Sequence, residues 1–284
     1  MVGKRAGKRK RILVSWILRM ILIPLSAVMV YPLIWNLYSS FKTNTEFLED
    51  AMKLPEHPMW SNYVQAITET NLGVSILNSI VIVLSSTAIL ALLTIPCTYC
   101  LVRYRFPGAK LILKVYMALL FIPDSSTLIQ LFLVMRNLHL LNSRAALSLL
   151  YAATGVAFPI FLLSGFLSKI PRDYEEAAMI DGCGPFRILV NVVMPLARPG
   201  IVTVCMFSAI GSWNEYMTAM VMLTDEKKKT LAVAMAHLYE VQRYATDWGT
   251  LFAALVIALV STLLIFMIGQ KYIVQGMNIG GLKG

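Results

Sequence analysis

Four consecutive residues, Trp213, Asn214, Glu215 and Tyr216, combine a planar amide and a carboxylate with two aromatic rings. Planar hydrogen-bonding groups bind hydroxyls, and aromatic faces pack against flat apolar surfaces such as sugar rings. The four residues lie in an apolar stretch, where ionisable side chains are expensive and each one suggests a functional site. They predict binding of a hydroxyl-rich ligand, and the alternative is hydrogen bonding between helices.

Two further polar residues interrupt apolar stretches. Asn78 lies early in one of them, and Asp124 follows Pro123 in another, where the proline would leave backbone carbonyls free. With the four residues above, Asn78 and Asp124 form our predicted set for a solute path, and hydrogen bonding between helices remains the alternative for each. Cys97 and Cys100 form a C-x-x-C, but it lies inside an apolar run with no second Cys or His pair nearby, and the histidines are widely separated. We therefore predict no metal site.

Residues 170–200 form an amphipathic connector with strong helix start and stop signals. Pro171 favours the first turn of a helix, the acids that follow it suit the positive end of that helix, and Gly182 favours its end. A Gly-Pro pair then predicts a second helix, which we expect to stop at Pro195. The prediction is a helix, a glycine elbow and a helix, exposed for a partner to bind. A connector that only packs beneath the membrane spans explains these signals equally well.

Apolar segments of membrane-spanning length must position these residues. The chain of 284 residues is 58% hydrophobic and only 14% charged, whereas soluble domains are about 25% charged. At 1.5 Å per residue, each of six segments is long enough to cross a hydrocarbon core of about 30 Å. The segments are residues 12–40, 73–102, 111–134, 145–167, 200–223 and 250–269. We therefore predict an all-α, polytopic membrane protein with six transmembrane helices.

Basic residues set the expected orientation. The net charge is +10, and residues 1–11 are strongly basic. With this tail inside the cell, the inner segments carry about twice as many Lys and Arg residues as the outer ones. We predict a basic cytoplasmic tail (1–11), a six-span domain (12–284) whose loop 170–200 is cytoplasmic, and both chain ends in the cytoplasm. A basic cluster beside a span also attracts anionic lipid, so the charge does not indicate a nucleic-acid partner.

The connector also resembles a family signature. Its residues are similar to the E-A-A-x-x-x-G-x(9)-I-x-L-P pattern of ATP-binding-cassette importer permeases, with Val and Met in place of Ile and Leu. The residues of this resemblance are Glu176, Ala177, Ala178, Asp181, Gly182 and Pro195. The stretch 213–216 looks like the W-N-x-[FY] of maltose-type permeases, and the second span and the end of the chain are similar to the same branch.

This resemblance implies a permease subunit of the carbohydrate-uptake branch, in a prokaryotic plasma membrane. An extracytoplasmic sugar-binding protein would deliver the solute, a second permease subunit would complete the path, and two ATPase subunits would bind the connector through a coupling helix between spans four and five. ATP and Mg²⁺ would belong to those ATPase subunits. The chain itself contains no P-loop motif, and we expect it to bind no cofactor.

Other functions predict other features. A permease for a non-sugar solute would share the connector signature, but the stretch 213–216 favours sugar. A secondary transporter would show paired, interrupted spans in inverted repeats, which the sequence lacks. A membrane-embedded enzyme would need a catalytic constellation, and neither H-E-x-x-H nor G-x-S-x-G occurs.

Overall fold

The computed structural model describes residues 2–68, 70–245 and 247–281, and no strand occurs among them. The undescribed side chains within those ranges are those of residues 2–14, 17, 124, 125, 242–245, 268 and 271–281. The all-α prediction is confirmed. The chain forms two compact units, Met1–Thr70 with Leu238–Ile257, and Asn71–His237 with Ala258–Gly284.

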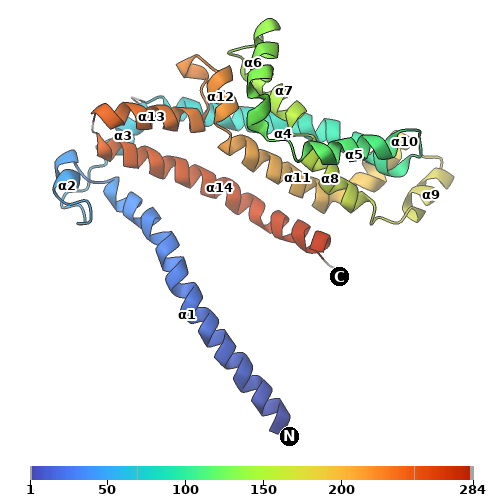
Figure 1. Ribbon diagram of the computed structural model, residues 1–284, viewed down its shortest axis with the longest axis horizontal. Coiled ribbons are helices and arrows are strands. Elements are labelled where there is room, and N and C mark those ends of the chain that lie inside the picture. The colour runs from blue at the N-terminus through green and yellow to red at the C-terminus, as the bar shows by residue number, and fades with distance from the viewer. Residues whose placement is uncertain (1, 69, 246, 282–284) are drawn as a thin grey trace. The chain divides into compact units, whose positions relative to one another are not determined.

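The first unit begins with one long helix (Figure 1). Its elements are α1 (Val2–Ser39), α2 (Asn44–Glu49), α3 (Ser61–Thr68) and the adjoining parts of α13 (Leu231–Ala245) and α14 (Trp248–Gly281). The basic tail expected at 1–11 continues into the first span as helix from Val2, and its side chains lie outside the described ones. Side chains 18–34 of α1 are exposed, as expected for an apolar helix that faces lipid.

Lys42 holds together the two sides of the segment that follows α1. Its side chain is only 1% exposed, and its ammonium group donates to the carbonyl oxygens of Asp50 and Ala51, each at 3.0 Å. The ammonium group also lies over the rings of Tyr38 and Phe47. Burial lowers the pKa of Lys42. The carbonyls and rings replace the water that the cation loses, which keeps this loop compact.

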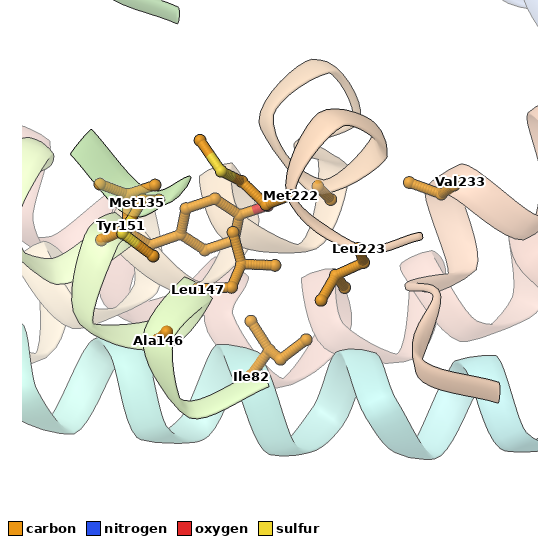
Figure 2. Close-up of a cluster of buried hydrophobic side chains, with 10 residues drawn as sticks. Ile82, Met135, Ala146, Leu147, Tyr151, Met222, Leu223 and Val233 are labelled. Atoms are coloured by element: carbon orange, nitrogen blue, oxygen red, sulfur yellow. The ribbon is translucent and has the colours of Figure 1, made fainter. Parts of the chain in front are cut away.

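The second unit is built around α4 (Leu72–Arg103), which packs against α7, α8 and α11 (Figure 1). Its other elements are α5 (Ala109–Leu119), the 3₁₀ turn η1 (Asp124–Thr127), α6 (Leu128–Asn137), α7 (Arg144–Thr154), α8 (Ala157–Leu167), α9 (Asp173–Ile180), α10 (Pro185–Ile188), the π turn η2 (Leu189–Val193), α11 (Met194–Asn214), α12 (Met217–Met222) and the 3₁₀ turn η3 (Glu226–Lys228). In the core cluster of Figure 2, Ile82 of α4 and Leu147 of α7 gather with Met222 of α12.

The spans agree in part with the six predicted segments. Among the described residues, four helices are long and apolar enough to cross a membrane, and α7 with α8 forms a further candidate that is bent by 51°. The predicted segment 111–134 is divided between α5 and α6 around Pro123, which lacks an N–H for a continuous helix. The predicted segment 200–223 is divided between α11 and α12. The structure gives a multi-span helical protein, and the count of six stays a prediction.

Candidate functional site

The turn that follows α9 has the geometry that its sequence predicts. The helix begins at Asp173 with acids in its first turn, which suits the positive end of a helix. At its other end, the N–H of Gly182 donates to the carbonyl of Met179 at 3.0 Å, and that of Cys183 donates to the carbonyl of Ala178 at 2.9 Å. These bonds form a Schellman motif, and Gly182 has a φ of 79°. The turn therefore requires a residue without a Cβ atom, or one that tolerates the left-handed region.

The second helix does not stop at Pro195, so that prediction was wrong. The chain continues from α10 through η2 into α11 and reaches Asn214 as one apolar helix of 30 residues, Pro185–Asn214. Pro195 occupies one of the first two positions of α11, where a missing N–H is tolerated. The wider π turn before it changes the hydrogen-bond register and accommodates the ring. The second arm of the elbow is therefore the start of a span.

A buried ion pair that we did not predict fastens α9 to α4. Oε1 of Glu175 lies 2.7 Å from Nε of Arg103, with the side chains 9% and 7% exposed, although the contact lacks hydrogen-bond alignment. The hydroxyl of Tyr99 donates to Oε2 of Glu175 at 3.0 Å. Arg103 also donates to the carbonyl of Ile170 at 2.8 Å, and Arg172 donates to the carbonyl of Arg103 at 3.1 Å. Hydrogen bonds therefore compensate Oε2 of Glu175 and one terminal nitrogen of Arg103, while Nε and Oε1 rely on their charge contact with each other.

A sequence signal for this pair exists but is weak. A helix that lies against a span turns one face inward, and α9 carries three acids in its first turn, so one of them can fall on the buried face. The structure buries Glu175 and exposes Glu176. The sequence alone does not reveal the partner, because Arg103 belongs to a distant segment and is one of several basic residues there.

The outer surface of the elbow combines polar and large apolar side chains. Of the six predicted motif residues, Ala178 is buried, and the exposed ones are Glu176, Ala177, Asp181, Gly182 and Pro195. Ile180 is 87% exposed and Phe186 is 78% exposed. A cavity of about 310 Å³, lined in part by Glu176 and Met179, lies beside them. Exposed apolar groups of this size next to polar ones are typical of a protein-binding surface.

Glu215 stabilises a break in the helix instead of presenting a free carboxylate. It lies between α11 and α12, and its Oε1 accepts from the N–H of Thr218 at 2.7 Å. Its Oε2 accepts from the N–H of Ala219 at 3.0 Å and from the hydroxyl of Tyr151. Both carboxylate oxygens are therefore engaged, in capping α12 and in holding it to α7.

The neighbours of Glu215 differ in their exposure. Trp213 is 5% exposed, and its indole N–H donates to the hydroxyl of Thr262 at 3.1 Å. Tyr216 packs against the core cluster of Figure 2. Asn214 is exposed at the end of α11, where its amide donates to the carbonyl of Ile210 at 2.8 Å. Of these four residues, only Asn214 presents an exposed side chain.

Asn78 connects α4 to two other elements. It is 1% exposed, and its Nδ2 donates to the carbonyls of Lys227 at 2.9 Å and Lys229 at 3.0 Å. Its Oδ1 accepts from the guanidinium group of Arg144, at the start of α7, at 2.6 Å. Asn78 is therefore engaged on both sides of its amide, as expected for hydrogen bonding between helices.

Asp124 begins η1, and its side chain lies outside the described ones. Among the residues that the structure describes, no group of three or more His, Cys, Asp or Glu side chains is placed to hold a metal ion. All four cysteines carry free thiols.

Comparison with known proteins gives consistent matches over most of the chain. Residues 75–279 match the family described as the binding-protein-dependent transport system inner membrane component. The diacetylchitobiose uptake system permease protein NgcG of Streptomyces coelicolor is 38% identical over 93% of this chain and 87% of its own length. The sulfoquinovosyl glycerol transport system permease protein SmoH of Agrobacterium fabrum is 35% identical over 90% of this chain and 89% of its own.

More distant matches extend the comparison. The trehalose/maltose transport system permease protein MalG of Thermococcus litoralis is 29% identical over 94% of this chain and 98% of its own. A chain in the crystal structure of a bacterial ABC transporter that imports alginate superposes with a TM-score of 0.81 at 24% identity, over 93% of this chain and 98% of that one. This last match shows that the two chains share a fold.

Proposed function

Because this chain belongs to the binding-protein-dependent transport system inner membrane component family, whose members are membrane transport proteins and not enzymes, we propose that it is a permease subunit of an ATP-binding-cassette importer for a sugar or oligosaccharide. The observation that carries the proposal is the exposed elbow of α9, Gly182 and α10, held rigidly to α4 by the Arg103–Glu175 pair. The chain has six spans in this proposal, and three of them are interrupted: α5 with α6, α7 with α8, and α11 with α12.

The carbohydrate class is supported by the relatives. NgcG, SmoH and the MalG of Thermococcus litoralis are named for diacetylchitobiose, sulfoquinovosyl glycerol and trehalose or maltose. Each of these solutes contains a sugar unit. An importer of a non-sugar solute remains the alternative, since the elbow alone does not select a solute.

The elbow serves as the coupling helix for two ATPase subunits, which hold ATP and Mg²⁺. Glu176, Asp181 and Gly182 present polar groups and backbone to the ATPase, while Ile180 and Phe186 supply apolar contacts. The loop 170–200 and both chain ends then lie in the cytoplasm of a prokaryote. A second permease subunit completes the path, and an extracytoplasmic sugar-binding protein delivers the solute to the opposite face.

In the solute path, the predicted residues have two roles. Asn214 is exposed and contacts the solute, because its amide is the accessible polar group at the end of α11. Trp213, Glu215, Tyr216 and Asn78 shape the path by holding the helices that surround it.

Reconstitution tests the function. The chain, its partner permease, the ATPase subunits and the binding protein are assembled in liposomes, and ATP hydrolysis and uptake are measured with oligosaccharides or with peptides. We expect sugar to stimulate both, and stimulation by peptides alone would overturn the sugar assignment.

A cysteine introduced at Asp181, in a chain without its native cysteines, should react with an impermeant thiol reagent only from the cytoplasmic side. Reaction from outside would exclude the coupling role.

A further inference from the structure

Buried polar side chains hold α4 near both of its ends. Near one end, Arg103 and Tyr99 bind Glu175 of α9. Near the other end, Asn78 binds the backbone at residues 227 and 229, together with Arg144 of α7. Between them α4 is one unbroken helix, and the distance from Asn78 to Arg103 is about 38 Å at 1.5 Å per residue. A single continuous helix, with Pro96 inside it, therefore joins the elbow to the loop 224–231.

A second bond strengthens the attachment at the Asn78 end. The hydroxyl of Ser79, which is 2% exposed, accepts from the N–H of Leu231 at 2.8 Å. Asn78 and Ser79 are successive residues, so they hold the loop at two points and prevent it from rotating about one bond. Both anchors are buried and polar, so detaching the loop from α4 would leave buried groups without partners.

The attachment at the elbow end is equally firm. Among the ion pairs of the described residues, Arg103–Glu175 is the one with both side chains less than 10% exposed, and the other pairs include at least one side chain exposed well above that. Separating two buried charges is unfavourable, because each would be left without a partner. Apolar packing alone would hold α9 against α4, but it would permit sliding, whereas an ion pair with a tyrosine donor fixes the position of α9.

We propose that α4 is the rod that transmits movement between the elbow and the loop 224–231, and that Glu175 and Asn78 are the positioning residues at its two ends. The inference rests on the proposed function of the elbow as the ATPase-binding element. On that basis, closure of the ATPases displaces α9, and α4 carries the displacement to the opposite face. Coupling is reciprocal, so arrival of the loaded binding protein at that face reaches the ATPases through the same rod.

The first test is the variant Glu175→Gln in the reconstituted complex. The readout is the ratio of ATP hydrolysis with sugar-loaded binding protein to hydrolysis without it. We expect this ratio to fall by about tenfold, within the usual range of coupling between sites, while the ATPases still co-purify. The matched control is Asp173→Asn, which removes an exposed acid from the same helical turn and should leave the ratio unchanged.

The second test asks whether both ends act through one element. Asn78→Ser shortens the anchor at the other end and should lower the same ratio. If one rod carries the coupling, the double variant loses no more than the more severe single variant, whereas independent effects would multiply. Multiplied losses would overturn the proposal.

The outcomes separate the rod from the proposed function. A wild-type complex without sugar-stimulated hydrolysis would overturn the importer assignment itself. A responsive wild type with full stimulation in Glu175→Gln would overturn the rod alone. Should Glu175→Gln fail to assemble, Tyr99→Phe removes only the hydroxyl donor to Glu175. A loss of stimulation in an assembled Tyr99→Phe complex supports the rod, and an unchanged ratio overturns it.

Discussion

Two of the breaks between consecutive helices in the second unit, at Gly182 and at Glu215, are built in different ways. At Gly182 the break is made by backbone: a glycine at positive φ and two main-chain hydrogen bonds end α9. At Glu215 it is made by a side chain, whose carboxylate caps α12 and binds the hydroxyl of Tyr151. The first break needs only local sequence, whereas the second needs a partner from another helix.

This difference bears on what each break is for. A backbone turn with an open outer surface keeps its shape while a partner binds it, which suits the elbow. The carboxylate at Glu215 adds to its local capping bonds a hydrogen bond from the hydroxyl of Tyr151 in α7, so this break also depends on how the bundle is packed. We therefore expect substitutions at the elbow to affect coupling, and substitutions at Glu215 to affect the stability of the fold.

The largest effect is expected from Gly182→Val. A Cβ at this position would meet no atom within 4 Å, so the strain comes from the left-handed backbone, which costs about 1–2 kcal/mol and more for a branched residue. The turn should rearrange, and sugar uptake by the reconstituted complex should fall by about tenfold or more. The protein should still insert in the membrane, as cell fractionation would show.

Gly182→Asn is the matched variant for this turn. Asparagine tolerates the left-handed region, so uptake should stay within about threefold of the wild type. Equal uptake by the valine and asparagine variants would show that the backbone conformation of Gly182 is irrelevant to coupling.

A smaller effect on transport, and a clear one on stability, is expected from Glu215→Ala. The N–H groups of Thr218 and Ala219 and the hydroxyl of Tyr151 would lose their acceptor, at about 1–3 kcal/mol for each buried group. The midpoint of thermal unfolding of the purified complex should fall by several degrees. Glu215→Gln keeps one acceptor oxygen and should show about half of the shift. If Gly182→Val lowered the midpoint as much as Glu215→Ala, the two breaks would not differ as described.

The sequence predicted the elements better than the contacts between them. Helix α9 and its cap at Gly182 follow from residue types that act within a few positions, and both are confirmed. The sequence does not predict the division of the segment 200–223. Glu215 is an isolated polar residue in the sequence, and only the fold brings Tyr151 into contact with it. The pairing of Glu175 with Arg103 is likewise tertiary. Pro195 was misjudged because the π turn that accommodates it has no clear local signal.

Asn214 and Trp213 offer a finer comparison beside the Glu215 break. Asn214→Ala removes the exposed amide, and loss of a solute hydrogen bond of about 1 kcal/mol should lower the maximal rate of sugar uptake about fivefold. The midpoint of thermal unfolding should not change. Trp213→Phe should lower the midpoint of thermal unfolding and leave the rate of uptake unchanged. It loses the buried hydrogen bond to Thr262 and leaves the exposed surface unaltered. Slower uptake with Trp213→Phe and normal uptake with Asn214→Ala would show that Trp213, and not Asn214, contacts the solute.

The smallest effect is expected from Pro195→Ala. Had this proline ended the second arm of the elbow, its removal would fuse two helices and impair transport. In the structure the helical path already runs through it, with Pro195 in one of the first two positions of α11 after the π turn. Alanine fits there and restores an N–H, so uptake should stay within about twofold of the wild type and the midpoint of unfolding should hold or rise slightly. A tenfold loss of uptake would mean that the ring itself maintains the π turn, and that the second arm, like the Glu215 break, is shaped by a side chain.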